Sequence, residues 1–183
     1  MDAIIKSLEA RGMLNNTVII YFNDHGVRGK ESSYEAGARI PAFMWRQGGF
    51  GGGHVSNDLV STIDVAPTVL ELAGIDVSPY RDELDGVSLV QYLEGLPVGE
   101  DPNLMPAVGG AVRSHLYIEA PFQRAVVQAG SGWKFSARRF PSGIVPGKEQ
   151  TLLYHAAKAH PKSFWHGNAL FNLVEDPDEL NNV

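Results

Sequence analysis

The sequence of 183 residues contains no cysteine. This absence excludes disulfides, a thiol nucleophile and thiolate zinc sites, although it does not identify a compartment. No apolar run approaches the roughly 20 residues that a membrane-spanning helix needs, so no membrane span is expected. Lysine and arginine form no basic stripe, and nucleic acid, which requires clustered cations against its phosphates, is therefore not an expected partner.

The acidic excess lies in the first half of the chain. The net charge is −6, and residues 1–98 carry 7 Lys and Arg against 13 Asp and Glu, whereas residues 99–183 carry 8 of each. Hydrophobic residues make up 44%, which is ordinary for a globular protein with a core. The 20 glycines and 11 prolines predict many turns rather than a helical bundle.

The first half has the pattern of an α/β unit. Residues 3–12 place apolar side chains on one helical face and stop at a glycine. Residues 17–22 form a continuous β-branched run, typical of a strand covered on both faces in a parallel sheet. A helix that leads directly into such a strand is half of a βαβ unit. We therefore expect that the chain begins within a larger fold.

Further elements follow along the chain. Residues 40–45 predict a second strand, and residues 61–74 predict a helix with Asp64 at its N-cap. Residues 87–95 predict another short helix. Beyond a Pro- and Gly-rich linker, alternating segments predict a small antiparallel sheet packed with one helix; these segments are residues 113–120, 124–130, 133–139 and 170–179, and the helix is 148–160.

The strongest chemical signal is Asn23-Asp24-His25-Gly26, which comes directly after the first predicted strand. Ligands of open α/β sheets bind beyond the carboxyl ends of the strands. A carboxylate beside an imidazole at such a tip can hold a divalent metal or transfer protons. The alternative is structural, with Asp24 capping the turn and His25 an ordinary loop residue.

The stretch FNDHGVRGKESSYEAGARIPAFMW resembles the C-terminal signature of the sulfatase family. There a strand ends in Ser-Asp-His/Asn-Gly, a loop carries Gly-Lys, and Tyr-Glu-Gly-Gly-x-Arg-x-Pro follows. The resemblance continues through VSNDLVSTIDVAPTVLELAGI, LDGVSLVQYLEG and the closing LFNLVEDPDELNNV. Several motifs in the family's order are more specific than any one of them.

The resemblance implies a fold class and a division of the chain. The fold would be α/β, the C-terminal part of a sulfatase-type mixed sheet with flanking helices, plus a small antiparallel C-terminal subdomain with one helix. Residues 1–98 would form the C-terminal part of the catalytic domain. Residues 99–111 would be a linker, and residues 112–183 would form the subdomain.

The resemblance also assigns site residues. Asp24 matches a carboxylate ligand of a divalent cation, usually Ca²⁺, and His25 matches the adjacent position, where it would ligate the metal or contact the sulfate instead. Lys30 matches the lysine that pairs with the sulfate group, although a solvated loop lysine remains the alternative. Glu35 and Arg39 match motif positions that we interpret as a structural ion pair holding the Lys30 loop.

The sequence departs from the family pattern in two respects. Glu31 and Ala36 replace residues that are usually Gly in the family, and the negative charge of Glu31 beside Lys30 is expected to weaken anion binding. No Cys or Ser stands at the start of a Cys/Ser-x-Pro-x-Arg motif, the source of the formylglycine nucleophile. The resemblance therefore implies a sulfatase fragment that lacks the nucleophile segment, with formylglycine expected only in the missing N-terminal part.

The function implied is hydrolysis of sulfate esters in the full-length context, on a sulfated small molecule or glycan, with the isolated chain inactive. The alternatives are a phosphomonoesterase or phosphodiesterase of the same alkaline-phosphatase-like superfamily, and a non-catalytic module derived from a sulfatase tail. The protein partners left open are the missing N-terminal portion and a second copy of the chain.

Overall fold

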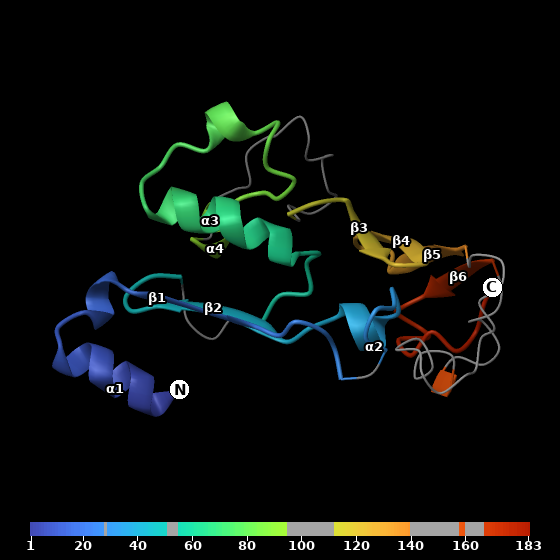
Figure 1. Cartoon of the computed structure of the whole chain (residues 1–183), viewed down its shortest axis with the longest axis horizontal. Helices are drawn as coiled ribbons and strands as arrows, with labels where there is room; N and C mark the ends of the chain where they lie inside the picture. The colour runs from blue at the N-terminus through green and yellow to red at the C-terminus, as the bar shows by residue number, and fades with distance from the viewer. Residues whose placement is uncertain (28, 51–54, 95–111, 140–157, 160–166) are drawn as a thin grey trace.

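The structure, a computed structural model, describes residues 1–27, 29–50, 55–94, 112–139, 158–159 and 167–183. It contains two separate antiparallel sheets, with α2 (Glu35–Ala38) between them (Figure 1). The first pairs β1 (Val18–Phe22) with β2 (Ala42–Arg46), and the second has the order β3-β4-β5-β6. The predicted mixed α/β class is confirmed.

The N-terminal region follows the predicted order. The helix α1 (Asp2–Ala10) leads through a short 3-10 helix, η1 (Leu14–Asn16), into β1. β1 and β2 pair from Val18 opposite Arg46 to Phe22 opposite Ala42, so the predicted parallel pairing is wrong for the residues that the structure describes. The apolar run over residues 17–22 predicted a strand with apolar side chains on both faces. It did not reveal the direction of its neighbour.

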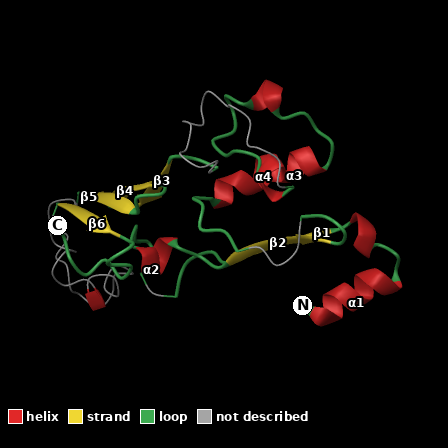
Figure 2. Ribbon diagram, turned by 180° about the vertical axis from the view of Figure 1, so that it is seen from behind, coloured by secondary structure: helices red, strands yellow, loops and turns green. Residues whose placement is uncertain are grey.

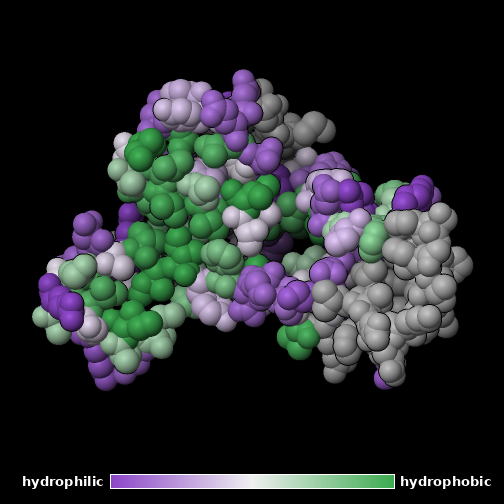
Figure 3. All heavy atoms as spheres, viewed as in Figure 1, coloured by the Kyte–Doolittle hydropathy of each residue, from purple (hydrophilic) through white to green (hydrophobic). Residues whose placement is uncertain are grey.

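The strand pair β1–β2 is only half covered. Tyr21 stacks on Phe43 with ring centroids 5.3 Å apart, and both side chains remain exposed, as does Phe22. In Figure 3 the apolar surface extends from α3 (Val65–Leu72) across β1 and β2. The predicted covering of both faces is therefore not observed in this part of the chain.

The predicted helix over 61–74 is present in two parts, η2 (Thr62–Asp64) and α3. Asp64 is the N-cap residue of α3, as predicted, but its side chain makes no capping bond to α3. Ser61 and Asp64 instead form a capping box around η2, in which the Asp64 carboxylate accepts the Ser61 backbone N–H at 2.7 Å. After η3 (Ser78–Tyr80), α4 covers only Val90–Leu93. It begins three residues later than predicted, and its N-cap residue Leu89 donates its backbone N–H to Thr68 Oγ1 of α3.

The C-terminal sheet is confirmed strand by strand. It contains β3 (His115–Ala120), β4 (Gln123–Gln128), β5 (Trp133–Arg138) and β6 (Asn168–Asn172), all antiparallel. Its core cluster contains Phe171 and Ala169 of β6 together with Tyr34, the residue before α2. The predicted linker, residues 99–111, lies outside the described residues, as does nearly all of the predicted helix over 148–160.

The view from behind shows that α2 lies between the two sheets, at the start of β2 (Figure 2). The segment from the end of β1 to the start of β2, which contains α2, therefore links the two sheets, and it carries the predicted site residues.

Within the described residues, no helix is long and apolar enough to cross a membrane.

Candidate functional site

The turn after β1 carries Asp24 and His25. Tyr21, near the end of the strand, donates its hydroxyl hydrogen to Asn23 Oδ1 at 2.7 Å, which fixes the start of the turn. Asp24 is exposed and His25 is half-buried. Both side chains therefore stand at the carboxyl end of a strand, where the sequence placed them.

Only one oxygen of the Asp24 carboxylate, Oδ1, accepts a hydrogen bond from a described residue. The His25 backbone N–H donates to Oδ1 at 3.1 Å, whereas Oδ2 lies 3.7 Å from His25 Nε2. His25 Nδ1 lies 2.7 Å from the Gly26 carbonyl oxygen. With the proton on Nδ1 donated to that oxygen, Nε2 carries the lone pair on the side of the carboxylate. Two atoms that can ligate a metal, Asp24 Oδ2 and His25 Nε2, thus lie side by side.

This donor pair fits two ligand positions of one divalent cation. A hard cation such as Ca²⁺ prefers oxygen, which makes Asp24 the stronger ligand of the two. Among the residues that the structure describes, no group of three or more His, Asp or Glu side chains gathers in one place.

The turn is held against α2 by a close backbone contact. The Gly26 N–H donates to the Gly37 carbonyl at 2.8 Å. A Cβ at position 26 would lie 2.3 Å from the Ala36 carbonyl oxygen, so only glycine permits this approach. The position of Asp24 and His25 consequently depends on the position of α2.

Lys30 lies in the adjoining loop, between Gly29 and Ser32. The Ser32 N–H and hydroxyl both donate to the Gly29 carbonyl, at 3.0 and 2.6 Å, and close the loop into a tight turn. Lys30 is exposed, and no hydrogen bond or ion pair joins it to another described residue. Its amine is available to an anion, but the structure shows no contact between it and Asp24 or His25.

The predicted ion pair between Glu35 and Arg39 is wrong. Glu35 Oε1 instead binds Lys134 Nζ at 2.8 Å, across to β5 of the C-terminal sheet. Arg39 is exposed and has no ion-pair partner among the described residues. The spacing of four residues places the two side chains on one helical face, but α2 ends at Ala38, and the buried ammonium is the better partner for the carboxylate.

An open pocket of about 390 Å³ lies beside this segment. It is lined by Val27 from the turn after β1 and by Glu35, Ala36 and Arg39 from α2 and its end. The pocket therefore lies immediately next to the turn that carries Asp24 and His25.

Comparisons with known proteins agree with the motif order. The family model described as Sulfatase matches residues 1–75, which include Asp24, His25 and Lys30. Human arylsulfatase K (Homo sapiens) is 31% identical over 198 residues, covering 100% of this chain. The chain is a sulfatase-like protein. Its motifs are those of the C-terminal portion of the family.

Further relatives agree with this assignment. The N-acetylglucosamine-6-sulfatase of Homo sapiens is 34% identical over 103 residues, covering 52% of the sulfatase-like chain and 18% of that relative. The solved structure of BT4656 in complex with its substrate, D-glucosamine-2-N,6-O-disulfate, matches with a TM-score of 0.68 at 21% identity, covering 99% of this chain and 32% of that chain. The latter match shows the shared fold.

The sulfatase-like chain spans 30% of the length of arylsulfatase K. Sulfatases in general use a divalent cation, and the donor pair of Asp24 and His25 fits part of such a site.

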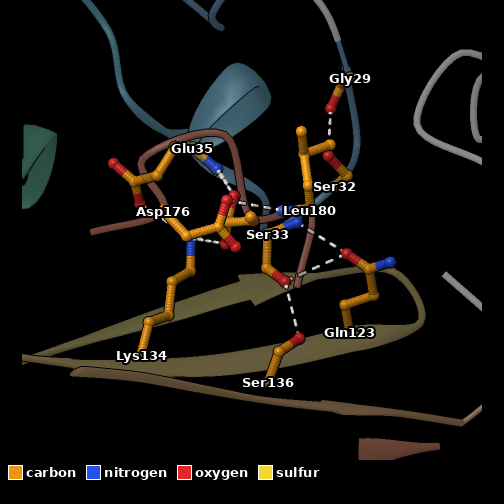
Figure 4. Close-up of polar contacts among 10 residues, drawn as sticks. Gly29, Ser32, Ser33, Glu35, Gln123, Lys134, Ser136, Asp176 and Leu180 are labelled. Carbon is orange, nitrogen blue, oxygen red and sulfur yellow. Dashed lines mark hydrogen bonds and ion pairs between the residues drawn. The ribbon is translucent and has the colours of Figure 1, made fainter. Parts of the chain in front are cut away.

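One group of residues near the site was not predicted. Three buried residues contact the segment 33–35 from the C-terminal sheet, namely Lys134 and Ser136 on β5 and Gln123 on β4 (Figure 4). The buried Glu179 of the C-terminal tail contacts the same segment through the Glu35 backbone N–H. Burial raises the pKa of the Glu179 carboxyl, and the nearby Lys134 ammonium offsets this in part. The alternation of β5 could have indicated Lys134 as an inward residue, but polar side chains at such positions are normally assigned to the solvent face.

Proposed function

We propose that the sulfatase-like chain supplies part of the active site of a sulfate ester hydrolase. The observation that carries this proposal is the turn after β1. There an open carboxylate oxygen of Asp24 lies 3.7 Å from His25 Nε2, within the residues that the Sulfatase family model matches. The relatives reported above carry sulfatase names, so hydrolysis of a phosphate ester is not favoured.

In this proposal Asp24 and His25 hold one divalent cation, Ca²⁺ by preference for oxygen. When bound, the cation polarises the oxygens of the sulfate group as a Lewis acid. Asp24 supplies the charged oxygen, and the bond from His25 N–H to Oδ1 keeps the other oxygen directed outward. His25 keeps its proton on Nδ1 through the Gly26 carbonyl, which leaves Nε2 free to ligate.

Lys30 is the substrate-binding residue in the proposal. Lys30 is exposed, and two hydrogen bonds from Ser32 to the Gly29 carbonyl close the loop that carries it. The loop therefore presents a positive charge to solvent from a fixed backbone position. A lysine ammonium in this position stabilises negative charge that develops on sulfate oxygens. The substrate class is a sulfated small molecule or glycan, supported by the disulfated glucosamine bound to BT4656.

We place the nucleophile outside these 183 residues, because the sequence contains no Cys/Ser-x-Pro-x-Arg. The proposed organisation is a part of the catalytic domain over residues 1–98, a linker over 99–111 and a β-sheet subdomain over 112–183. The proposed protein partner is the portion that carries the nucleophile, whether in the same polypeptide or in a second one.

The test is an assay of sulfate release from glucosamine 6-sulfate by an enzyme in which residues 1–183 are combined with a nucleophile segment. Asp24→Ala is expected to abolish release, and Lys30→Ala to reduce it by a factor of about 10²–10³. Asp2→Ala, at an exposed position of α1, is the matched control and retains full activity. Hydrolysis of a phosphate ester but no sulfate ester would refute the proposal.

A second measurement applies to the chain as it is. Because Ca²⁺ needs six to eight ligands, calorimetric titration of the 183 residues with Ca²⁺ is expected to show very weak binding. Tight, stoichiometric binding that is lost in Asp24→Ala would show that the chain carries a whole site, and the part-site account would be wrong.

A further inference from the structure

Lys134 is a fully buried lysine whose ammonium lies between two carboxylates. Its Nζ binds Glu35 Oε1 at 2.8 Å and Glu179 Oε1 at 2.9 Å, and the lysine side chain is 0% exposed. The other Glu179 oxygen accepts the Glu35 backbone N–H at 2.5 Å. Burying an ammonium is unfavourable unless its charge is paired, so the two carboxylates and Lys134 form one mutually dependent unit.

An uncharged set of contacts lies beside these ion pairs. Gln123 Oε1 accepts the Ser33 N–H at 2.7 Å and the Ser33 hydroxyl at 3.1 Å, and the same hydroxyl lies 3.3 Å from Ser136 Oγ. Between Ser33 and Glu35, the Tyr34 ring packs in the core of the sheet. Figure 4 shows Ser33 and Glu35 directed at β4 and β5. Three successive residues are thus attached to the C-terminal sheet.

The attached segment continues directly into the candidate site. Glu35 is the first residue of α2, and α2 provides the Gly37 carbonyl that accepts the Gly26 N–H. On the other side, Ser32 closes the loop of Lys30 onto Gly29. A continuous series of buried contacts therefore joins β5 to the turn of Asp24 and His25 and to the loop of Lys30.

We propose that Lys134 is a positioning residue of the active site, which holds α2 on the C-terminal sheet through Glu35 and Glu179 and thereby sets the position of Lys30 and of the Asp24–His25 turn. This inference rests on the proposed function, since that function gives the positioned residues their task. It assigns the C-terminal sheet a part in building the site.

The test measures amide hydrogen exchange, residue by residue, in the 183-residue chain. In Lys134→Met the exchange of the Gly26 and Glu35 amides is expected to accelerate at least tenfold more than that of the ladder amides between β3 and β4. Lys134→Arg retains the charge and is expected to restore most of the protection. Unchanged Gly26 exchange in Lys134→Met, or equal acceleration of all amides, would overturn the inference.

Two milder variants decide the matter if Lys134→Met does not fold. Ser33→Ala removes only the contacts of one hydroxyl, and Glu35→Gln removes one charge of the unit. Both are expected to accelerate Gly26 exchange more than exchange in the β3–β4 ladder. Glu119→Gln, which breaks an exposed ion pair with Arg124 in the same sheet, is the matched control and is expected to leave Gly26 unchanged.

A titration with sodium sulfate separates this inference from the proposed function. The signals of Gly29 and Lys30 are expected to shift in the wild-type chain, and the apparent sulfate affinity is expected to fall at least threefold in Ser33→Ala. If the wild-type signals do not shift while the variants still accelerate Gly26 exchange as expected, sulfate binding at Lys30 is refuted. The dependence of the Asp24–His25 turn on Lys134 would then still stand. An unchanged affinity with accelerated Gly26 exchange would refute the positioning of Lys30.

Discussion

The two sheets differ in what they bury: neither β1 nor β2 has a fully buried residue, whereas the C-terminal sheet buries both apolar and polar side chains. β1 is apolar at all five positions, yet its Tyr21 and Phe22 are 42% and 45% exposed. β5 alternates, and it buries Lys134 and Ser136 completely while its Phe135 is 46% exposed. The chemical character of a strand therefore does not decide which residues are buried. The surface that packs against the strand decides it.

The difference follows from what each sheet packs against. Residues 33–35 and the C-terminal tail offer β5 carboxylates, hydroxyls and backbone N–H groups, so polar side chains on the inner face find partners. β1 has a single neighbouring strand, β2, among the described residues. A two-stranded sheet cannot cover its own apolar faces.

The largest expected effect is the loss of the buried ammonium. Lys134→Met leaves Glu35 and Glu179 without their cation and is expected to lower the free energy of unfolding by about 3–5 kcal/mol. Urea denaturation followed by circular dichroism measures the change. Lys6→Met, in the exposed pair with Asp2, is the control and is expected to have little measurable effect. Equal losses in the two variants would remove the distinction between the buried and exposed pairs.

Asp64 is expected to give the next largest effect, because it joins the N-terminal half to the segment before β3. The carboxylate is 0% exposed and accepts from the Ser61 and Val87 backbone N–H groups and from Arg113 Nη2, at 2.7, 3.0 and 2.5 Å. Asp64→Ala is expected to lower the free energy of unfolding by about 2–4 kcal/mol. Urea denaturation measures it, with the exposed Asp82→Ala as control. A loss below that of the control would contradict the structure.

Glu179 gives a smaller effect that depends on pH. Burial holds the pKa of its carboxyl above the usual 4.5, so the folded state retains the proton more strongly than the unfolded state does. Its contribution to stability therefore falls as the pH rises from 4.5 through the raised folded-state pKa. The free energy of unfolding of Glu179→Gln minus that of the wild type is therefore expected to be larger at pH 7 than at pH 4. Thermal unfolding across this range measures the difference, and a shift in the opposite direction, or an equal one in the exposed Glu175→Gln, would contradict it.

The smallest expected change is at the exposed rings. Tyr21→Ser on β1 and Tyr117→Ser on β3 each replace an exposed ring, and each is expected to change the free energy of unfolding by less than about 1 kcal/mol. Because apolar surface gathers around β1, only Tyr21→Ser is expected to reduce the fluorescence of a dye that binds apolar surface. Equal reductions in both variants would show that the two sheets expose similar apolar surface.

Much of the fold could be predicted locally. The six strands and the helices α1 and α3 were expected from periodicity, glycine stops and β-branched runs, because these signals act within a few residues. The strand direction of β1 and the length of α4 could not be predicted in this way. The direction of β1 depends on its pairing with β2, which lies more than 20 residues further along the chain.

The candidate site was predictable in part. The family motifs identified Asp24, His25 and Lys30, and the structure brings Asp24 and His25 together at the end of β1. The motif spacing led to the wrong partner for Glu35, since Lys134 lies 99 residues away in the sequence. The roles of all three site residues stay predictions, which the Asp24 and Lys30 variants test.

The amino-acid sequence by itself determined the order of the elements, the sulfatase-like motifs and the place of Asp24 and His25 at a strand end, since these depend on neighbouring residues. Only the tertiary structure decided that Lys134 is buried, that Glu35 binds it across to the C-terminal sheet and that Arg39 stays exposed. A charged side chain is buried only where opposite charge and hydrogen-bond partners converge on it. That convergence joins residues distant in the sequence, and no local pattern records it.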